Sequence, residues 1–293
     1  MIVLRAAHLG MCFGVRDAVA LARDRAGAGP LTILGDLVHN AAVLADLDAR
    51  GVAVATDPAA VTTPTVMITA HGASDRALAR TRALGLQVVE ATCPLVQVAH
   101  RAVKALVRDG CHPVIVGRRD HVEVRGLIED LDAVDVVLTA EDVDALAPRR
   151  RFGVAAQTTQ PLERVHAIAA LIRRRFPEAE VRLADTVCRP TKQRQAAAID
   201  LARRSDVVIV VGGAHSNNTR ELVTTCRRHC ARVHHVEDRD DLVAGWFAGA
   251  GTVGLTAGTS TPDAVIDDVE RRLHDIAAAG ERAPVPSPAA EAR

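Results

Sequence analysis

One short pattern occurs three times in this sequence and constrains the fold more than any other feature. An apolar strand is followed by a cysteine, and the cysteine opens a helix. The three copies lie at residues 2–15, 87–96 and 183–195, and their cysteines are Cys12, Cys93 and Cys188. If the chain folds as three similar lobes, the three thiols can converge on one centre.

Short, apolar strands alternate with helical stretches along the rest of the chain. The clearest strands are expected at 31–35, 65–70, 113–117, 152–157, 206–212 and 251–256. Such a pattern is typical of parallel sheets covered by helices on both faces. The sequence therefore predicts an α/β fold of three similar lobes with mostly parallel sheets. We place them at residues 13–93, at 94–185, and at 1–12 together with 186–280. The proline-rich segment 281–293 is expected to be a mobile tail.

The composition argues against several classes of partner. Lysine plus arginine and aspartate plus glutamate both number 36, so no overall charge attracts nucleic acid or an acidic membrane. Aromatic residues make up only 2% of the chain, which leaves few platforms for stacking bases. Neither a secretory signal nor an apolar run of membrane-spanning length is visible. We expect a cytoplasmic protein that binds neither nucleic acid nor membrane.

Six cysteines in such a chain favour reduced thiols, metal ligands or catalytic groups over disulfides. Three thiolates can hold three corners of a four-iron cluster and leave one iron open as a Lewis acid. Spacing alone supports this weakly, because no pair has the Cys-x-x-Cys form. The alternative is that Cys12, Cys93 and Cys188 are small buried hydrophobic residues.

The other cysteines lack the repeated context. Cys226 and Cys230 lie four residues apart on a predicted helix beside His229, which leaves a metal site open as an interpretation. Cys111 precedes a strand and is most simply a packing residue.

Polar side chains gather after the predicted strands. His39, His71 and His121 each follow a strand, and imidazoles donate hydrogen bonds and can carry charge near neutral pH. Further hydroxyl and amide donors stand in two other strand-end loops, namely Ser216, Asn217, Asn218 and Ser260. Together these donors predict a cage for a phosphate or diphosphate. For each histidine alone, capping of a helix or bonding to a backbone carbonyl is the alternative.

Glu123 is the best placed carboxylate for delivering a proton. It follows His121 by two residues, and a desolvated acid beside a ligand can hold its proton to neutral pH. A surface glutamate paired with Arg125 is the alternative. Thr158 ends another strand and supplies a further donor, with helix capping as its alternative. Nucleotide-binding glycine motifs are absent from the sequence, which disfavours NAD and ATP.

With these residues in place, the sequence resembles the 4-hydroxy-3-methylbut-2-enyl diphosphate reductases, which complete the non-mevalonate isoprenoid pathway. The resemblance covers residue 2 to about residue 275. The matching motifs, all in the family's order, are Gly10-Met-Cys12-Phe-Gly, Val38-His39-Asn40, Ala70-His71-Gly72, Ala91-Thr-Cys93-Pro, Gln157-Thr158-Thr159, Thr191-x-x-Arg194-Gln195 and Thr256-Ala-Gly-x-Ser260-x-Pro262-Asp.

The resemblance implies a trefoil of three lobes around a [4Fe–4S] cluster, held by Cys12, Cys93 and Cys188 with one iron open to substrate. It implies that Glu123 is the proton donor and that Thr158 lies near the reacting hydroxyl. The residues implied to bind the diphosphate are His39, His71, His121, Ser216, Asn218 and Ser260. Electrons are expected singly from a ferredoxin or flavodoxin, and isopentenyl and dimethylallyl diphosphates are the expected products.

Two substrate loops depart from the family pattern. The usual Gly-His-Pro-Glu-Val-Glu-Gly reads Asp-His-Val-Glu-Val-Arg-Gly at residues 120–126, and the usual Ser-Ser-Asn-Ser reads Ser-Asn-Asn-Thr at 216–219. Arg125 adds a cation to the first loop. This leaves open a same-fold iron–sulfur enzyme that removes a hydroxyl or thiol from another anionic substrate. A non-catalytic iron–sulfur sensor is the third hypothesis.

Overall fold

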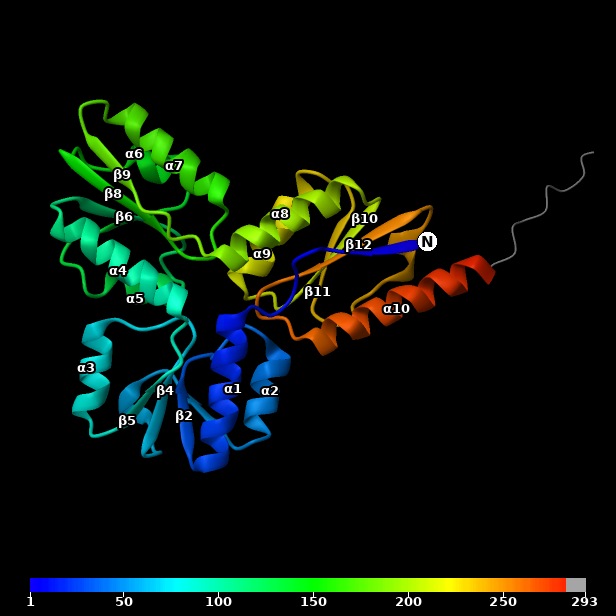
Figure 1. Ribbon diagram of the computed structural model, residues 1–293, viewed down its shortest axis with the longest axis horizontal. Coiled ribbons are helices and arrows are strands. Elements are labelled where there is room, and N and C mark those ends of the chain that lie inside the picture. Colours follow the sequence, from blue (N-terminus) through cyan, green and yellow to red (C-terminus); the bar gives the residue numbers. More distant parts are fainter. Residues whose placement is uncertain (283–293) are drawn as a thin grey trace, which may run out of the picture.

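The computed structural model describes residues 1–282, and the chain forms three α/β lobes (Figure 1). Each lobe contains one four-stranded sheet, and every strand pairing in the three sheets is parallel. The predicted fold of three lobes with parallel sheets is therefore confirmed. The expected tail lies outside the described residues from residue 283 on, and residues 281 and 282 belong to the last helix.

The first lobe carries a sheet of order β3-β2-β4-β5. Helices α1 and α2 cover one face and α3 covers the other (Figure 1). Its elements are α1 (Phe13–Ala28), β2 (Leu31–Leu34), α2 (Ala41–Asp48), β3 (Ala53–Ala55), the 3-10 turn η1 (Pro58–Ala60), β4 (Thr65–Ile68), α3 (Asp75–Ala83) and β5 (Gln87–Glu90). The side chains of Asn40 and Ser74 cap α2 and α3, so both helices begin directly after a strand-end loop.

The second lobe repeats this plan with a sheet of order β7-β6-β8-β9. Its elements are α4 (Pro94–Arg108), β6 (His112–Val116), α5 (Val122–Ile128), β7 (Asp135–Val137), α6 (Ala140–Asp144), β8 (Arg151–Ala156), α7 (Leu162–Arg175) and β9 (Glu180–Leu183). Phe152 is the largest fully buried side chain in this lobe, and it packs in the core beneath α7.

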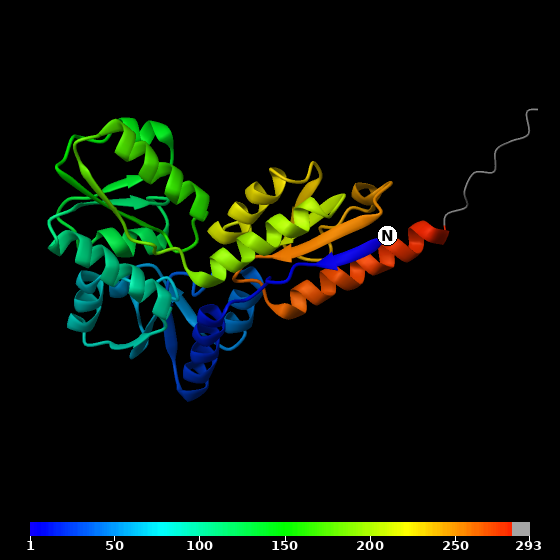
Figure 2. The same cartoon turned by 45° about the horizontal axis from the view of Figure 1, so that its top comes forward.

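The third lobe combines the beginning of the chain with its last third in a sheet of order β1-β12-β10-β11. Its elements are β1 (Ile2–Arg5), α8 (Arg189–Arg203), β10 (Val207–Val211), α9 (Asn217–Arg227), β11 (Val233–Val236), the 3-10 turn η2 (Ala244–Phe247), β12 (Thr252–Ala257) and α10 (Asp263–Arg282). All five residues of β10 are buried, as expected for an apolar central strand covered on both faces. Figure 2 shows α10 lying along this sheet beside β1.

The chain leaves each lobe at an edge strand. The strands β1, β5 and β9 each lie at the edge of their sheet, and the helices α1, α4 and α8 then open the next lobe. The first turns of these three helices meet where the lobes join (Figure 1). The crossing points between lobes therefore lie together, and each crossing point holds one of the repeated cysteines.

Candidate active site at the junction of the three lobes

Each repeated cysteine is the N-cap residue of a helix. Cys12 precedes α1, Cys93 precedes α4 and Cys188 precedes α8, and none of the three sulfurs accepts a capping hydrogen bond. All three thiols are free, half-buried and line the same cavity. A helix N-terminus stabilises negative charge, so the position favours thiolate ligands.

Gly14 and Thr191 are the close neighbours of two of the sulfurs, those of Cys93 and Cys188. Gly14 lies on the first turn of α1, and a Cβ at that position would come within 2.4 Å of the Cys93 Sγ. Only glycine lets Cys93 approach α1 so closely. In the third lobe, the Cys188 Sγ lies 3.1 Å from the hydroxyl of buried Thr191. Burial raises the pKa of the Cys93 thiol, and it raises that of Cys188 to about 11.

The three predicted histidines form a compact cluster in the same cavity. The ring centroids of His39 and His71 are 4.5 Å apart. The ring centroid of His121 lies 5.3 Å from that of His39 and 5.5 Å from that of His71. Burial is the main cause that lowers all three pKa values, that of His71 well below its ordinary value and that of His121 to about 3. At neutral pH the cluster is therefore a set of uncharged imidazoles.

The geometry of His121 decides what this cluster can bind. His121 is the N-cap of α5, and its Nδ1 accepts the backbone N–H of Glu123 at 3.1 Å. A neutral imidazole whose Nδ1 accepts must carry its proton on Nε2. Although the three rings bring their nitrogens within 4.8 Å of one another, the free nitrogen of His121 is thus a donor, not a metal ligand. Capping and a cavity role coexist in this residue.

Donors from the third lobe complete the cavity wall, which includes Ser216, Asn217, Asn218 and Ser260. Asn218 accepts the Thr259 N–H with its Oδ1, and its buried Nδ2 has no partner, so its N–H groups are free for a ligand. Ser216 caps α9 through its oxygen, which leaves its hydroxyl hydrogen available. Asn217 instead donates to the Thr159 hydroxyl at 3.0 Å and thereby joins the second and third lobes.

The Ser260 hydroxyl is already engaged in another contact between lobes. It donates to the backbone carbonyl of His39 at 3.1 Å, so it joins the first and third lobes at the edge of the cavity. The Nδ1 of His39 has no hydrogen-bond partner and lies 3.8 Å from Asp36.

Glu123 is buried in the cavity wall and has only 2% of its surface exposed. Its two oxygens accept the backbone N–H of Thr158 at 2.6 Å and the Thr158 hydroxyl at 3.0 Å. Burial raises the pKa of Glu123 from 4.5 to about 7, and the two bonds from Thr158 limit that rise. The interpretation of Glu123 as a surface partner of Arg125 is therefore wrong.

The charged side chains of Arg118, Asp120 and Arg220 lie near the cavity but do not line it. Arg118 pairs with Asp120 at 2.6 Å, and Arg220 follows Asn218 on α9. Arg220 is close enough to His39 and His121 to lower their pKa values, and it forms no side-chain hydrogen bond or ion pair with any residue from 1 to 282.

Arg125, the substitution that singled out this loop in the sequence, does not reach the site. Its side chain is exposed on α5 and is not part of the cavity wall.

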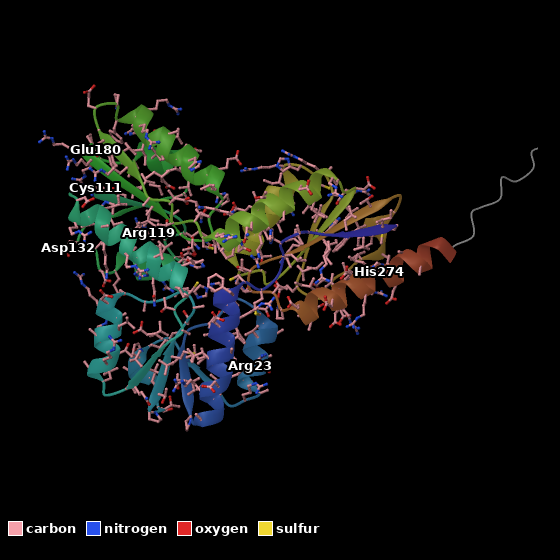
Figure 3. All side chains as sticks on the ribbon, viewed as in Figure 1. Arg23, Cys111, Arg119, Asp132, Glu180 and His274 are labelled. Atoms are coloured by element: carbon pink, nitrogen blue, oxygen red, sulfur yellow. The ribbon has the colours of Figure 1, made fainter. Side chains whose placement is uncertain are left out.

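The other cysteines are core residues. Cys226 and Cys230 pack among Val208, Val210 and Leu222, and their sulfurs lie against backbone carbonyls. Cys111 is buried at the start of β6, on the far side of the second lobe from the junction (Figure 3). Among the described residues, none of these three thiols belongs to a cluster of metal-binding side chains.

Two residues of the quoted motifs lie at the thiols although sequence reasoning gave them no role. Thr191 contacts the Cys188 sulfur, and Arg194 is buried on α8 with its guanidinium close to Cys12 and Cys188. Their helical spacing from Cys188, three and six residues, was the available signal.

A junction that combines three thiols at helix N-caps, a buried acid and neutral hydrogen-bond donors in one cavity is typical of the active site of an α/β enzyme. The chain belongs to the LytB protein family, whose model matches residues 3–274. Among the described residues, no helix is both long and apolar enough to cross a membrane.

Two curated relatives of this chain carry the same name, 4-hydroxy-3-methylbut-2-enyl diphosphate reductase. The protein of Pelobacter propionicus is 38% identical over 278 residues, which cover 94% of this chain and 99% of that protein. The protein of Aquifex aeolicus is 35% identical over 280 residues, which cover 94% and 96%.

Two solved structures share the fold. The reductase structure from Plasmodium falciparum superposes with a TM-score of 0.87 at 24% identity and covers 92% of this chain and 87% of that one. A second structure is described as (E)-4-hydroxy-3-methyl-but-2-enyl diphosphate reductase, the terminal enzyme of the non-mevalonate pathway. It gives a TM-score of 0.67 at 35% identity, with 94% of this chain and 100% of that chain covered.

Proposed function

We propose that this protein is a 4-hydroxy-3-methylbut-2-enyl diphosphate reductase. It would remove the hydroxyl group reductively and form isopentenyl and dimethylallyl diphosphates, the last step of the non-mevalonate pathway. One observation carries the proposal: three thiols at helix N-caps, an acid with a pKa of about 7 and neutral donors line one cavity. The family and the named relatives point to the same reaction.

The donor set fits an iron–sulfur cluster. Three free thiols, each at the N-terminus of a helix from a different lobe, face one cavity, and Gly14 lacks the side chain that would collide with the Cys93 sulfur. We infer that Cys12, Cys93 and Cys188 hold a [4Fe–4S] cluster with one iron left open. When bound, this group supplies electrons singly and a Lewis acid for the substrate oxygen.

The diphosphate would be held by neutral donors. The Nε2–H of His121 and the unpartnered N–H groups of Asn218 face a cavity that also contains His39, His71, Ser216 and Ser260. Hydrogen bonds from neutral donors to a charged oxygen are stronger than bonds between neutral groups. Arg220 lies nearby without an ion pair among the described residues, so its charge can offset the charge of the ligand.

Glu123 would deliver the proton that the allylic product needs. With a pKa of about 7, about half of the carboxyl groups are protonated at neutral pH, which is the useful range for a general acid. The backbone N–H and hydroxyl of Thr158 hold the carboxyl group in one orientation. The Thr158 hydroxyl can rotate and accept from the protonated acid, so it remains a partner in both states.

The electron donor and the compartment follow from the same proposal. We infer a ferredoxin or flavodoxin as donor, because the two electrons must arrive singly. All six cysteines lie within the described residues and are free, which is typical of a reducing compartment such as the cytoplasm.

The site argues against the two alternative functions, an enzyme for another anionic substrate and a non-catalytic sensor. The hypothesis of a different anionic substrate depended on Arg125, which is exposed outside the cavity wall. The sensor hypothesis gives no reason for a buried acid beside the thiols. Retention of Glu123 and Thr158 in one hydrogen-bonded pair favours catalysis.

Anaerobic turnover tests the proposal. Protein reconstituted with iron and sulfide is given 4-hydroxy-3-methylbut-2-enyl diphosphate and a strong one-electron reductant, and both five-carbon diphosphates are measured. We expect both products and competitive inhibition by pyrophosphate. A protein that contains iron and sulfide but forms neither product would overturn the assignment.

A further inference from the structure

Arg194 is a buried cation without a carboxylate partner. It lies on α8, six residues after Cys188, and has 7% of its surface exposed. Its Nε and Nη2 donate to the Gly10 carbonyl at 2.9 Å and 2.7 Å, and its Nη1 donates to the Pro190 carbonyl at 3.1 Å. No carboxylate of residues 1–282 forms an ion pair with it. A charge buried against neutral carbonyls alone is unfavourable, so a negative group should lie nearby when the protein is functional.

The groups that face the guanidinium identify that negative charge. The ionisable side chains close to Arg194 are Cys12, Cys188 and Arg16. Arg16 is itself a cation, and it pairs with Asp263 at 3.0 Å on the surface. The two thiols are therefore the groups near Arg194 that can become negative, and they do so when they act as metal ligands.

The same guanidinium joins the two segments that carry these thiols. Gly10 lies two residues before Cys12 and has a φ of +71°, and a Cβ at Gly10 would come within 2.6 Å of the Ile266 side chain. Pro190 lies two residues after Cys188 in the first turn of α8. Both carbonyls are thus held by one planar side chain, and arginine is suited to such a fork of hydrogen bonds.

We propose that Arg194 is a positioning residue that fixes Cys12 relative to Cys188 and raises the reduction potential of the centre the two thiolates hold. Hydrogen bonds and charge around sulfur ligands tune the potential of iron–sulfur centres. A nearby positive charge favours the reduced form, because that form carries one more negative charge. The inference rests on the proposed function only in requiring an iron–sulfur centre.

Two variants separate charge from geometry. Arg194→Gln removes the charge, whereas Arg194→Lys keeps the charge and loses the fork. Arg16→Gln is the matched control. Arg16 also donates to a backbone carbonyl next to Cys12, that of Met11, but Asp263 already offsets its charge at the surface. The readouts are iron per chain after anaerobic reconstitution and the midpoint potential from a redox titration followed by absorption and electron paramagnetic resonance.

We expect the Gln variant to have a lower midpoint potential. The Lys variant should keep the wild-type potential and lose iron faster to a chelator, and the Arg16 control should change neither. An unchanged potential in an iron-loaded Gln variant overturns the inference. If that variant holds no iron, the Lys variant decides: a wild-type potential supports the role of the charge, and a potential lowered despite the retained charge refutes it.

These readouts need no substrate, so they are distinct from the test of the reaction. Wild-type protein that holds the cluster without forming product would refute the proposed function and leave Arg194 testable. Wild-type protein that binds no iron would refute both.

Discussion

Replacement of Glu123 by glutamine tests whether burial makes this residue the proton donor. The carboxyl group is enclosed in the cavity wall, and its pKa is raised to about 7 chiefly by burial. Glutamine has the same shape and can still accept a hydrogen bond from Thr158, but it has no proton to transfer. The change should therefore remove chemistry and leave the wall of the cavity in place.

The pKa of Glu123 sets the expected pH profile. The reaction needs the protonated acid, and a raised pKa means that this form is complete well below pH 7 and is lost as the pH rises through about 7. At saturating substrate, wild-type kcat should be level below pH 6 and fall about tenfold per pH unit above 7. The Glu123→Gln variant should show a flat profile, reduced by roughly 100-fold to 10,000-fold, a typical general acid contribution.

The assay is anaerobic turnover at saturating substrate from pH 5.5 to 9, with iron per chain measured for each sample. Glu141→Gln is the matched control, since Glu141 is exposed on α6 and hydrogen bonds lower its pKa. The control should follow the wild-type profile. A wild-type kcat that stays level to pH 9, or a Gln variant with full iron and undiminished turnover, would refute the role of the buried acid.

Three further substitutions test the packing around the thiols, the charge of Arg220 and the hydrogen bond from Thr158 to Glu123. Gly14→Ala should lower iron per chain after reconstitution, because the added Cβ meets the Cys93 sulfur, whereas Gly27→Ala on the same helix meets nothing and should load normally. Arg220→Gln should raise KM several-fold at unchanged kcat and weaken the salt dependence of KM. Arg125→Gln, at an exposed position outside the cavity wall, should do neither. Thr158→Val removes a bond that lowers the acid's pKa, so the kcat inflection should move to higher pH; an unmoved inflection contradicts this.

The meeting of the three thiols could be predicted from the sequence. Each cysteine follows an edge strand across a loop and directly precedes the helix that opens the next lobe, and this repeated pattern puts Cys12, Cys93 and Cys188 at successive crossings between lobes. In parallel sheets the groups that follow strands gather at the carboxyl ends. His71 and Glu123 could be assigned to the same region by that rule alone.

Side-chain direction could not be predicted in the same way. Arg125 and Glu123 lie two residues apart on one short helix, yet one faces solvent and the other is buried, because α5 turns them to different sides. The choice depends on which face of α5 packs against the loop of Thr158, a contact between residues 35 positions apart. Likewise, the spacing of Arg194 from Cys188 shows a shared helix, but its contact with Gly10 spans 184 positions.

The neutral state of the histidines determines how the cavity must bind an anion. Burial, with smaller contributions from His39, Arg118 and Arg220, holds the pKa of His121 at about 3, so protonating it at pH 7 would cost about 5 kcal/mol. A single charge-assisted hydrogen bond contributes about 1.5–3 kcal/mol, which is too little to offset that cost. His121 should therefore bind as a neutral Nε2–H donor, and pyrophosphate should bind without proton uptake by this ring.

Calorimetric titrations at pH 8, where pyrophosphate itself exchanges few protons, measure proton uptake from the difference between the binding enthalpies in two buffers of unlike ionisation enthalpy. His121→Asn keeps the helix cap and loses the cavity donor. The variant should bind pyrophosphate more weakly with the same proton count, and uptake of a full proton by wild type but not by this variant would show that the ring is charged in the complex.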